Sequence, residues 1–451
     1  PVSPPLERRY AMMDRRHFAR VASTALAAVG LFPELLAGKG IRRQTRINGG
    51  RLHGWLEDLS RIGARPEGGV DRVAFSDADL EGRAYVRSLM EEVGLDVRID
   101  MAGNLLGRLE GSEPELPPIM LGSHLDSVPA GGNFDGPLGT LGALEGVLTL
   151  REGGIRTRHP LDVVAFANEE GGKTGSRVLA GEFRMDELSL ETASGFTIQE
   201  GIRRLGGNPE RLGEARVPPG DVAGYLELHV EQGAVLERKG VRIGVVEGIV
   251  GIRRWNVTVR GAANHAGTTP MDQRRDALLT ASELVQAVNR VVRSMPGSPV
   301  ATVGKIQASP GAPNVIPGEV TMTVEIRALT MERIQEVMDG IRREAQGMAG
   351  EHGTPIEMQE FYLSAAAPTD PRFQAWVEEA AEDLALSHHR MPSGAGHDAQ
   401  AVAHFAPTGM VFIPSVGGLS HHPDEFSRPE DVEAGANVLL GALLKADLGL
   451  D

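Results

Sequence analysis

Residues 117–126, PPIMLGSHLD, and residues 158–172, RHPLDVVAFANEEGG, decide the fold of this chain. Each contains a short continuous apolar run, which is typical of a strand buried on both faces. The segment between them, LGTLGALEGVLTLREGG at residues 138–154, has the length and pattern of a helix. A strand, a helix and a second strand in this order predict an α/β sheet flanked by helices. In such sheets, ligands bind beyond the carboxyl ends of the strands.

The same alternation continues on both sides of an inserted domain. Helices are predicted at residues 51–63 and 80–95, ahead of the first strand. Near residue 250 the order changes to strand, helix, strand, strand, helix and strand, which describes a ferredoxin-like α/β unit. We therefore expect a main domain with a mixed sheet, built from residues 46–249 and 363–451, with the ferredoxin-like domain inserted at residues 250–362.

Composition restricts the kind of site that the chain can build. At 451 residues, two domains are expected. A formal net charge of −15 argues against nucleic acid as a partner, because phosphate backbones are bound by clustered Lys and Arg. The chain has no cysteine, so disulfides and thiolate ligands are excluded. Any metal must be held by histidine and carboxylate, which favours a hydrolytic zinc, manganese, cobalt or nickel ion.

Residues 1–45 differ in pattern from the rest of the chain. Arg15 and Arg16 are followed by Phe18 and then by an apolar stretch at residues 21–38. This arrangement resembles a bacterial twin-arginine export signal, which predicts a periplasmic protein. The stretch is too short to span a bilayer as a helix, so no membrane span is expected. The alternative is a basic amphipathic helix at the N-terminus of a cytoplasmic protein.

Histidine and acidic side chains follow the first of the two strands. His124 and Asp126 are two residues apart at a strand end, so their side chains leave the same face. A metal-bound imidazole needs its second nitrogen held, and the Asp126 carboxylate is placed to do this. Asp135 follows in a glycine-rich loop, AGGNFDGPLG, that can turn its carboxylate back towards a metal. Bridging two ions is a natural role for such an aspartate.

Further candidates occur later in the chain. Glu169 and Glu170 end the second strand, and adjacent strand residues point to opposite sides. One of them can bind a metal while the other acts as a general base on water. His229 lies in a strand-like run, YLELHVEQG, and His421 in a loop, LSHHPDEF. A single histidine is more often a surface or core residue, but all of these segments together predict a metal site assembled by the whole fold.

The order of these motifs resembles a known family. HLDSVPAGGNFDGPLG, FANEEGG, ELHVEQG, NHAGTTPM and GLSHHPDEF together are similar to the M20-type metallohydrolases, over residues 50–450. Within that family the chain looks like the amidase, hydantoinase and carbamoylase branch, which includes N-carbamoyl-L-amino-acid hydrolase, β-ureidopropionase and allantoate amidohydrolase. The histidine of ELHVEQG marks this branch, because related exopeptidases and deacylases more often have an acidic ligand there.

The resemblance implies a site for two divalent metal ions. His124 and His229 would hold one ion. Glu170 and His421 would hold the other, with Asp135 as the bridge between them. Zinc, manganese, cobalt and nickel all accept such ligands, so the identity of the ions stays open.

The resemblance also implies catalytic and substrate-binding residues. Glu169 would be the general base that activates the bridging water, and Asp126 would orient His124. His265 would polarise the substrate carbonyl from a dimer partner, so the inserted domain would serve as a lid and a dimerisation domain in a homodimer. A guanidinium can clamp a carboxylate with two hydrogen bonds. The positions implied to bind a small carboxylate-bearing substrate are Gln232, Asn314, Arg327 and His397.

The leading hypothesis is metal-dependent hydrolysis of a linear amide or ureido C–N bond beside a carboxylate, as in an N-carbamoyl amino acid. The alternatives are an aminoacylase or small peptidase on the same scaffold, and an exported binding protein without catalysis. One departure from the relatives bears on the substrate. After NEEGG the chain runs KTGSRVLAG at residues 173–181, where relatives often have a longer stretch before GSR. This loop is expected to shape the pocket for the substrate side chain.

Overall fold

The computed structural model describes residues 45–450 of the chain. All but the last residue of the predicted export signal therefore lies outside the described residues, and export stays a prediction. Within the described range, no helix combines the length and the apolar character needed to cross a membrane.

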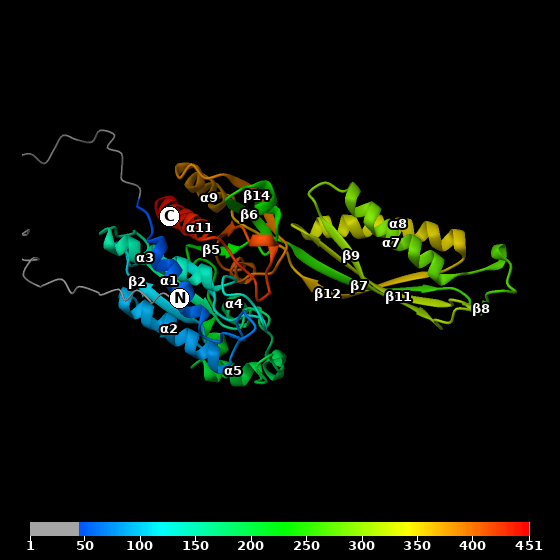
Figure 1. Cartoon of the computed structure of the whole chain (residues 1–451), viewed down its shortest axis with the longest axis horizontal. Helices are drawn as coiled ribbons and strands as arrows, with labels where there is room; N and C mark the ends of the chain where they lie inside the picture. Colours follow the sequence, from blue (N-terminus) through cyan, green and yellow to red (C-terminus); the bar gives the residue numbers. More distant parts are fainter. Residues whose placement is uncertain (1–44, 451) are drawn as a thin grey trace, which may run out of the picture. The chain divides into compact units, whose positions relative to one another are not determined.

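The larger of the two main sheets has nine strands. In chain order they are β1 (Asp96–Ile99), β2 (Leu105–Leu109), β3 (Ile119–His124), β4 (Leu161–Phe166), β5 (Gly224–Val230), β6 (Ile243–Ile249), β13 (Ala367–Pro368), β14 (His388–Ser393) and β15 (Thr408–Ile413). Their order in space is β1-β2-β4-β3-β5-β15-β6-β13, and β14 pairs with β6. Figure 1 labels β2, β5, β6 and β14 of this sheet. The central strands β4, β3, β5 and β15 are parallel, whereas β1, β2, β13 and the β15–β6 pair add antiparallel contacts. The expected α/β fold with a mixed sheet is confirmed.

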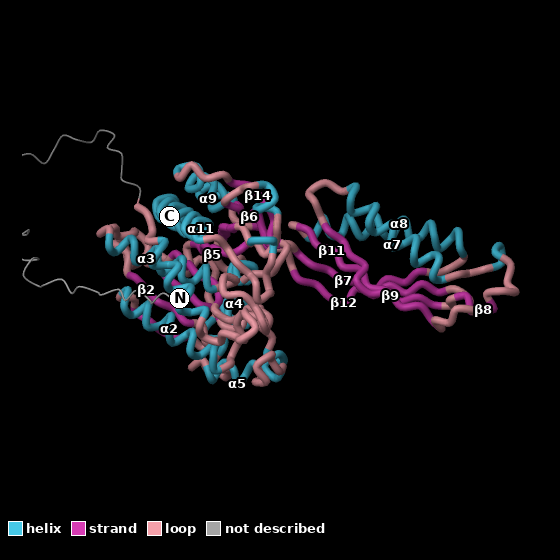
Figure 2. Tube along the Cα trace, viewed as in Figure 1, coloured by secondary structure: helices cyan, strands magenta, loops and turns pink. Residues whose placement is uncertain are grey.

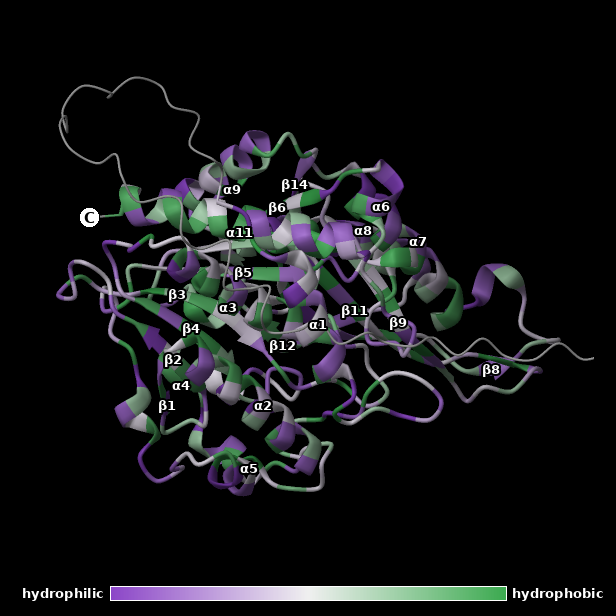
Figure 3. Cartoon of the chain, turned by 60° about the vertical axis from the view of Figure 1, so that its left-hand side comes forward, coloured by the Kyte–Doolittle hydropathy of each residue, from purple (hydrophilic) through white to green (hydrophobic). Residues whose placement is uncertain are grey.

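Helices cover both faces of this sheet. They are α1 (Gly49–Ser60), α2 (Asp77–Val93), α3 (Pro137–Glu152), α4 (Thr174–Ala180), α5 (Ile198–Arg204), α6 (Val235–Lys239), α9 (Pro371–Asp383), α10 (Asp398–Val402) and α11 (Pro429–Gly449). Alternate side chains of β4 point to opposite faces of the sheet and so belong to two parts of the core. Leu161, Val163 and Ala165 pack with α1, α2, α3, α9 and α11. Val164 and Phe166 point to the other face, towards α4 and α10. Figure 3 shows the hydrophobic colouring of β3, β4 and β5 between these helices.

The second sheet has four strands. They are β7 (Gly251–Arg260), β9 (Val300–Ser309), β11 (Glu319–Ala328) and β12 (Ile356–Ser364), in the order β12-β7-β11-β9 with every pair antiparallel. The helices α7 (Ala277–Ser294) and α8 (Met331–His352) cover one face (Figure 2). Together these elements have the ferredoxin-like order β-α-β-β-α-β. Beyond them, β8 (Asn264–His265) pairs with β10 (Val315–Ile316). The described residues form one compact unit, so the domain boundaries drawn from the sequence stay a prediction.

One local prediction is wrong. β4 ends at Phe166, so Glu169 and Glu170 lie in a turn and not at the end of a strand. Asn168 adopts the left-handed conformation, with φ of 54°, which turns the chain sharply after the strand. Strand alternation therefore does not explain why the two glutamates differ. Their separate directions come from the turn.

Candidate metal centre

The predicted ligands surround one cavity beyond the carboxyl ends of the parallel strands. His124 is the last residue of β3, and His229 is the last but one of β5. Asp135 precedes α3, the glutamate turn follows β4, and His421 lies in the loop between β15 and α11. The cavity has a volume of about 230 Å³. Its lining residues are His124, Asp135, Glu169, Glu170, Gly172, Lys173, His229, Gln232, Ala395, Gly396, His397 and His421.

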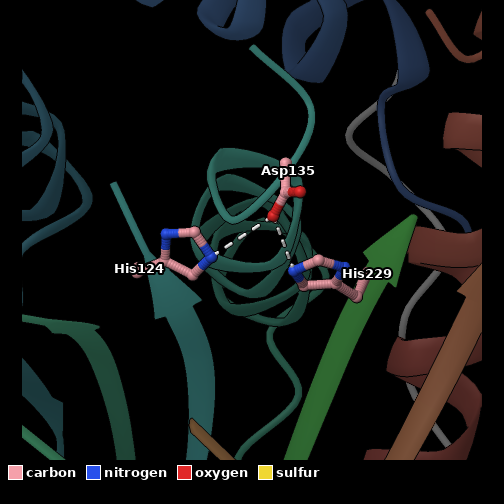
Figure 4. Close-up of side chains that lie close together, drawn as sticks. All are labelled: His124, Asp135 and His229. Atoms are coloured by element: carbon pink, nitrogen blue, oxygen red, sulfur yellow. Dashed lines mark ion pairs between the residues drawn. The ribbon is translucent and has the colours of Figure 1, made fainter. Parts of the chain in front are cut away.

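His124 and His229 face the same oxygen of Asp135 (Figure 4). The Nε2 atom of His124 lies 3.4 Å from Asp135 Oδ1, and that of His229 lies 3.2 Å from it. Each ring is also held at its other nitrogen. Nδ1 of His124 lies 2.9 Å from the main-chain oxygen of Asp126, and Nδ1 of His229 lies 2.9 Å from that of Val230. This is the arrangement that fixes the tautomer of a metal-binding histidine. The buried Nε2 of His229 has no hydrogen-bond partner, which leaves it available to an ion.

A second group of ligand atoms forms on the other oxygen of Asp135. The Nε2 atom of His421 lies 3.4 Å from Asp135 Oδ2 and 3.5 Å from Glu170 Oε1. In each of the two groups, the ligand atoms all lie within 4.8 Å of one another. Because Asp135 belongs to both, its carboxylate is placed between two candidate cation positions. The five predicted ligands are thus brought together as two groups that share one aspartate.

The charges of these groups disturb one another strongly. Burial and the nearby carboxylates of Asp135 and Glu169 raise the pKa of Glu170 to about 10. Burial would raise the pKa of Asp135 too, but the imidazoles of His229 and His124 hold it well below its ordinary value. Burial opposes the charge on His124, yet its contact with Asp135 and the surrounding carboxylates keeps its pKa well above the ordinary value. Buried acids and histidine nitrogens in this arrangement fit divalent cations, whose charge offsets the repulsion.

Glu169 lies beside the two ligand groups without belonging to either. Its Oε2 atom is 4.0 Å from His124 Nε2, and its side chain is 10% exposed. Burial raises the pKa of its carboxyl above the ordinary value. A carboxylate with a raised pKa is better able to accept a proton from water at neutral pH, as a general base must.

Asp126 orients His124 through a different atom from the one expected. The main-chain oxygen of Asp126 is the partner of His124 Nδ1, at 2.9 Å, whereas the carboxylate Oδ1 is 3.8 Å away. The buried carboxylate accepts hydrogen bonds from the main-chain N–H groups of Glu169, at 3.3 Å, and Glu170, at 3.1 Å. The main chain of Asp126, and not its carboxylate as expected, holds the ring of His124. The reason is that β3 ends at His124, so strand alternation no longer sets the direction of the Asp126 side chain. The carboxylate of Asp126 shapes the glutamate turn.

Residues 120–445 match the peptidase family M20/M25/M40. The chain belongs to this family. An N-carbamoyl-L-amino acid amidohydrolase of Geobacillus stearothermophilus is 39% identical over 398 residues, which cover 87% of this chain and 97% of that protein. The allantoate amidohydrolase of Escherichia coli K12 is 36% identical over 390 residues, which cover 84% of this chain and 94% of that protein.

A solved structure supports the same conclusion. The crystal structure of an amidase of the hydantoinase/carbamoylase family from Burkholderia multivorans is 39% identical and has a TM-score of 0.81. The match covers 89% of this chain and 98% of that chain. The predicted resemblance to M20-type metallohydrolases and to this branch is confirmed. M20 members use divalent metals, in agreement with the ligand groups around Asp135.

Two of the four predicted substrate-binding residues lie at the cavity of this M20 protein. Gln232 has a left-handed backbone, and its Nε2 donates to Asp135 Oδ2 at 2.6 Å. His397 is buried, and its Nε2 lies 2.8 Å from the hydroxyl of Ser393. Its ring packs edge-on against that of His229, with centroids 4.4 Å apart. Burial and the neighbouring His229 hold the pKa of His397 well below its ordinary value, which favours a neutral ring.

The remaining predicted residues lie outside the cavity lining. Arg327 is on the four-stranded sheet, whereas His265 and Asn314 lie on or next to the β8–β10 pair. His265 is exposed on β8, where its Nδ1 accepts the main-chain N–H of Gly267 at 3.0 Å. Asn314 is also exposed, just before β10. Arg327, on β11, donates from Nη1 to the main-chain oxygen of Gly394 at 2.7 Å, close to the cavity-lining loop.

Sequence reasoning missed three charged residues around the site. Glu227 is buried on β5, and its ligand atoms group with those of His229 and His397. Glu425 is buried beside Asp135, and Lys173 lines the cavity. Both acids, Glu227 and Glu425, lie inside motifs that were quoted from the sequence, ELHVEQG and LSHHPDEF. Nothing local distinguishes them from solvated acids, because their partners are distant in sequence.

Proposed function

We propose that this protein is a metal-dependent amidohydrolase that cleaves a linear amide or ureido C–N bond in a small carboxylate-bearing molecule. The preferred candidate is an N-carbamoyl amino acid, whose hydrolysis releases the amino acid, carbon dioxide and ammonia. The observation that carries the proposal is Asp135 shared by two ligand groups, with Glu169 beside them. The names of the similar amidohydrolases support the type of bond.

The donor set suits two divalent cations. His124 and His229 would hold one, Glu170 and His421 the other, and Asp135 both. When bound, such ions polarise a carbonyl group and make water acidic enough to react at neutral pH. Zinc, manganese, cobalt and nickel are the candidates. Metal analysis of purified protein after dialysis tests the number, and two ions per chain are expected.

Glu169 would perform the proton transfers. Its carboxylate takes a proton from the attacking water and then passes it to the leaving nitrogen. The nitrogen therefore leaves as a neutral amine or as ammonia and not as an anion. The buried position of Glu169 supports this role, because burial raises its affinity for a proton. Gln232 and His397 lie at the cavity and would contact the substrate.

Arg327, Asn314 and His265 would complete the site from the second sheet. Arg327 would clamp the substrate carboxylate. His265 would polarise the scissile carbonyl from a second subunit, which makes the protein a homodimer with a lid formed by residues 250–362. His265 is exposed and lies outside the lining of this chain's cavity, which supports a contribution to the site of another subunit.

The dimer proposal is tested by mixing two inactive variants. Glu169→Gln and His265→Ala subunits are combined after reversible dissociation, and activity is compared with that of each variant alone. Partial recovery is expected, since a mixed dimer contains one site with both groups intact. No recovery, with light scattering showing mixed dimers, contradicts the contribution of His265 in trans.

The reaction is tested with purified protein reconstituted with zinc, manganese, cobalt or nickel. The panel contains N-carbamoyl amino acids, allantoate, N-acyl amino acids and dipeptides, with ammonia and amine release as readouts. Ammonia release from carbamoyl substrates is expected. Turnover of acyl amino acids or dipeptides alone would establish the alternative aminoacylase or peptidase. No turnover of any compound would leave a binding protein that has kept the fold.

A further inference from the structure

Lys173 occupies a special position at the metal-site cavity. Among the described residues, it is the one lysine or arginine that lines this cavity. It follows the glutamate turn directly and caps the start of α4 in a left-handed conformation, with φ of 58°. Its main-chain N–H donates to the carbonyl of Glu169 at 2.8 Å. The backbone of the general base and that of the lysine are therefore held together.

The ammonium group of Lys173 is held in place by a neutral partner. Nζ donates to Gln400 Oε1 at 2.7 Å, and Gln400 Nε2 in turn donates to the carbonyl of Ala365 at 2.6 Å. The ammonium also lies against the loop at Gly396, where an added Cβ would be 2.8 Å from Nζ. These contacts restrain a side chain that is flexible on most surfaces.

The charge of Lys173 has no close carboxylate to balance it. Among residues 45–450, no ion pair within 4.0 Å includes Lys173, although its positive charge is felt at Glu169 and His397. An ammonium has three donors, and Gln400 uses one of them. A restrained, half-buried cation with donors to spare at a cavity is suited to bind an anion from outside the protein.

A second cation approaches the same loop. Arg327 donates to the carbonyl of Gly394, two residues before Gly396. Two residues of chain span at most about 7 Å, so both cations lie near one short segment. Arg327 comes from β11, and Lys173 comes from the turn before α4. Separate cations on separate elements match a substrate that carries two anionic groups.

We propose that Lys173 makes this protein selective for substrates that carry a second carboxylate on the side chain, such as N-carbamoyl aspartate. The inference rests on the proposed amidohydrolase function, in which Arg327 binds the carboxylate next to the scissile nitrogen. Lys173 binds the side-chain carboxylate and acts as a specificity-determining residue.

The test compares an acidic substrate with a neutral one in matched variants. N-carbamoyl-L-aspartate and N-carbamoyl-L-alanine are assayed with the wild type, Lys173→Met and Arg184→Gln. Arg184 is an exposed cation of the same region that lies outside the cavity lining, so its replacement is the charge control. The wild type is expected to prefer the aspartate compound in kcat/KM. Lys173→Met should lower kcat/KM for that compound about 10- to 100-fold, as expected for loss of a charge-assisted hydrogen bond. The alanine compound should change little.

Direct binding separates this inference from the proposed reaction. Calorimetric titration of the metal-loaded Glu169→Gln protein with both compounds, with and without Lys173→Met, needs no turnover. Weaker binding of the aspartate compound alone supports the selectivity even if the reaction itself is different. An equal loss for both compounds contradicts it, because it would mean that Lys173 contacts a group that both compounds share, such as the carboxylate bound by Arg327. A wild type without preference for the acidic compound also overturns it.

Discussion

Glu425 accepts the main-chain N–H of Asp135 at 3.0 Å, although 290 residues separate the two in sequence. The same oxygen accepts the N–H of Phe134 at 2.9 Å. Its other oxygen accepts the hydroxyl of Ser420, which lies 2.8 Å from Asp135 Oδ2. A single buried carboxylate thus ties the loop of Asp135 to the loop of His421. The contact links the loops that carry ligands of the two groups.

Replacing Glu425 should therefore weaken metal binding. Glu425→Ala leaves the buried N–H of Asp135 and the partly buried N–H of Phe134 without this acceptor and frees the loop of Asp135. We expect about 10- to 100-fold lower metal affinity, which is the usual effect of losing a group that supports a ligand. Equilibrium dialysis with metal analysis measures it. Asp424→Asn, a change at the exposed neighbouring acid, is the control and should bind metal normally.

Adding one methyl group next to His124 should have a similar effect. Gly136 has φ of 83°, and an added Cβ would lie 2.4 Å from the His124 ring. Gly136→Ala should displace the imidazole, lower metal content and destabilise the fold by about 1–3 kcal/mol through overpacking. Gly146→Ala, inside the helix α3 that Gly136 precedes, is the control, because its added Cβ meets no atom within 4 Å. If both variants keep full metal content, the position inferred for His124 is contradicted.

Removing the carboxylate of Glu169 should stop turnover without removing the metal. Glu169→Gln is expected to lower kcat about 10²- to 10⁴-fold, as for loss of a general base. Metal content should be unchanged, since Glu169 stands outside both ligand groups. Steady-state assays and metal analysis are made on the same sample, with the exposed Glu81→Gln as a control. Wild-type turnover in Glu169→Gln would refute the assignment.

The metal-free protein should become less stable as pH rises. The ordinary pKa of Glu170 is 4.5, and the fold raises it to about 10. Between these values the folded state holds a proton that the unfolded chain has released, so the stability contribution present below pH 4.5 is lost as pH rises towards 10. Thermal melting of metal-free protein from pH 5 to pH 9 should show this decline, and Glu170→Gln should show a smaller one. Added zinc should reverse the trend, because metal binding favours the deprotonated ligands. Equal slopes in the two proteins would exclude Glu170 as the source.

Much of the fold follows from local patterns. The buried apolar runs of β3 and β4, the helix between them and the Gly94 that ends α2 are all visible as sequence signals. Strand β14 was not predicted, because HHRMPS lacks an apolar pattern and depends on parallel pairing with β6 for its conformation. The glutamate turn was mistaken for a strand end because its acids follow an apolar run without a turn-forming Gly or Pro between them.

The candidate site shows the same division. The motifs around His124, Asp135 and His421 could be selected from their residue types, since histidine and carboxylate are the ligands that remain in a chain without cysteine. The contacts of Glu425 and Lys173 were not visible, because their partners lie far away in sequence. Their chemistry depends on which groups surround them in space.

The sequence by itself determined the α/β fold, the family and the set of histidines and acids available for a metal centre. These depend on periodicity and on the order of motifs, which are written along the chain. Only the tertiary structure decided that both Nε2 atoms of His124 and His229 face one oxygen of Asp135, and that Glu425 holds that aspartate in place. Distances of 3–4 Å between such residues result from strand pairing and loop packing, which bring together parts of the chain that are far apart in sequence.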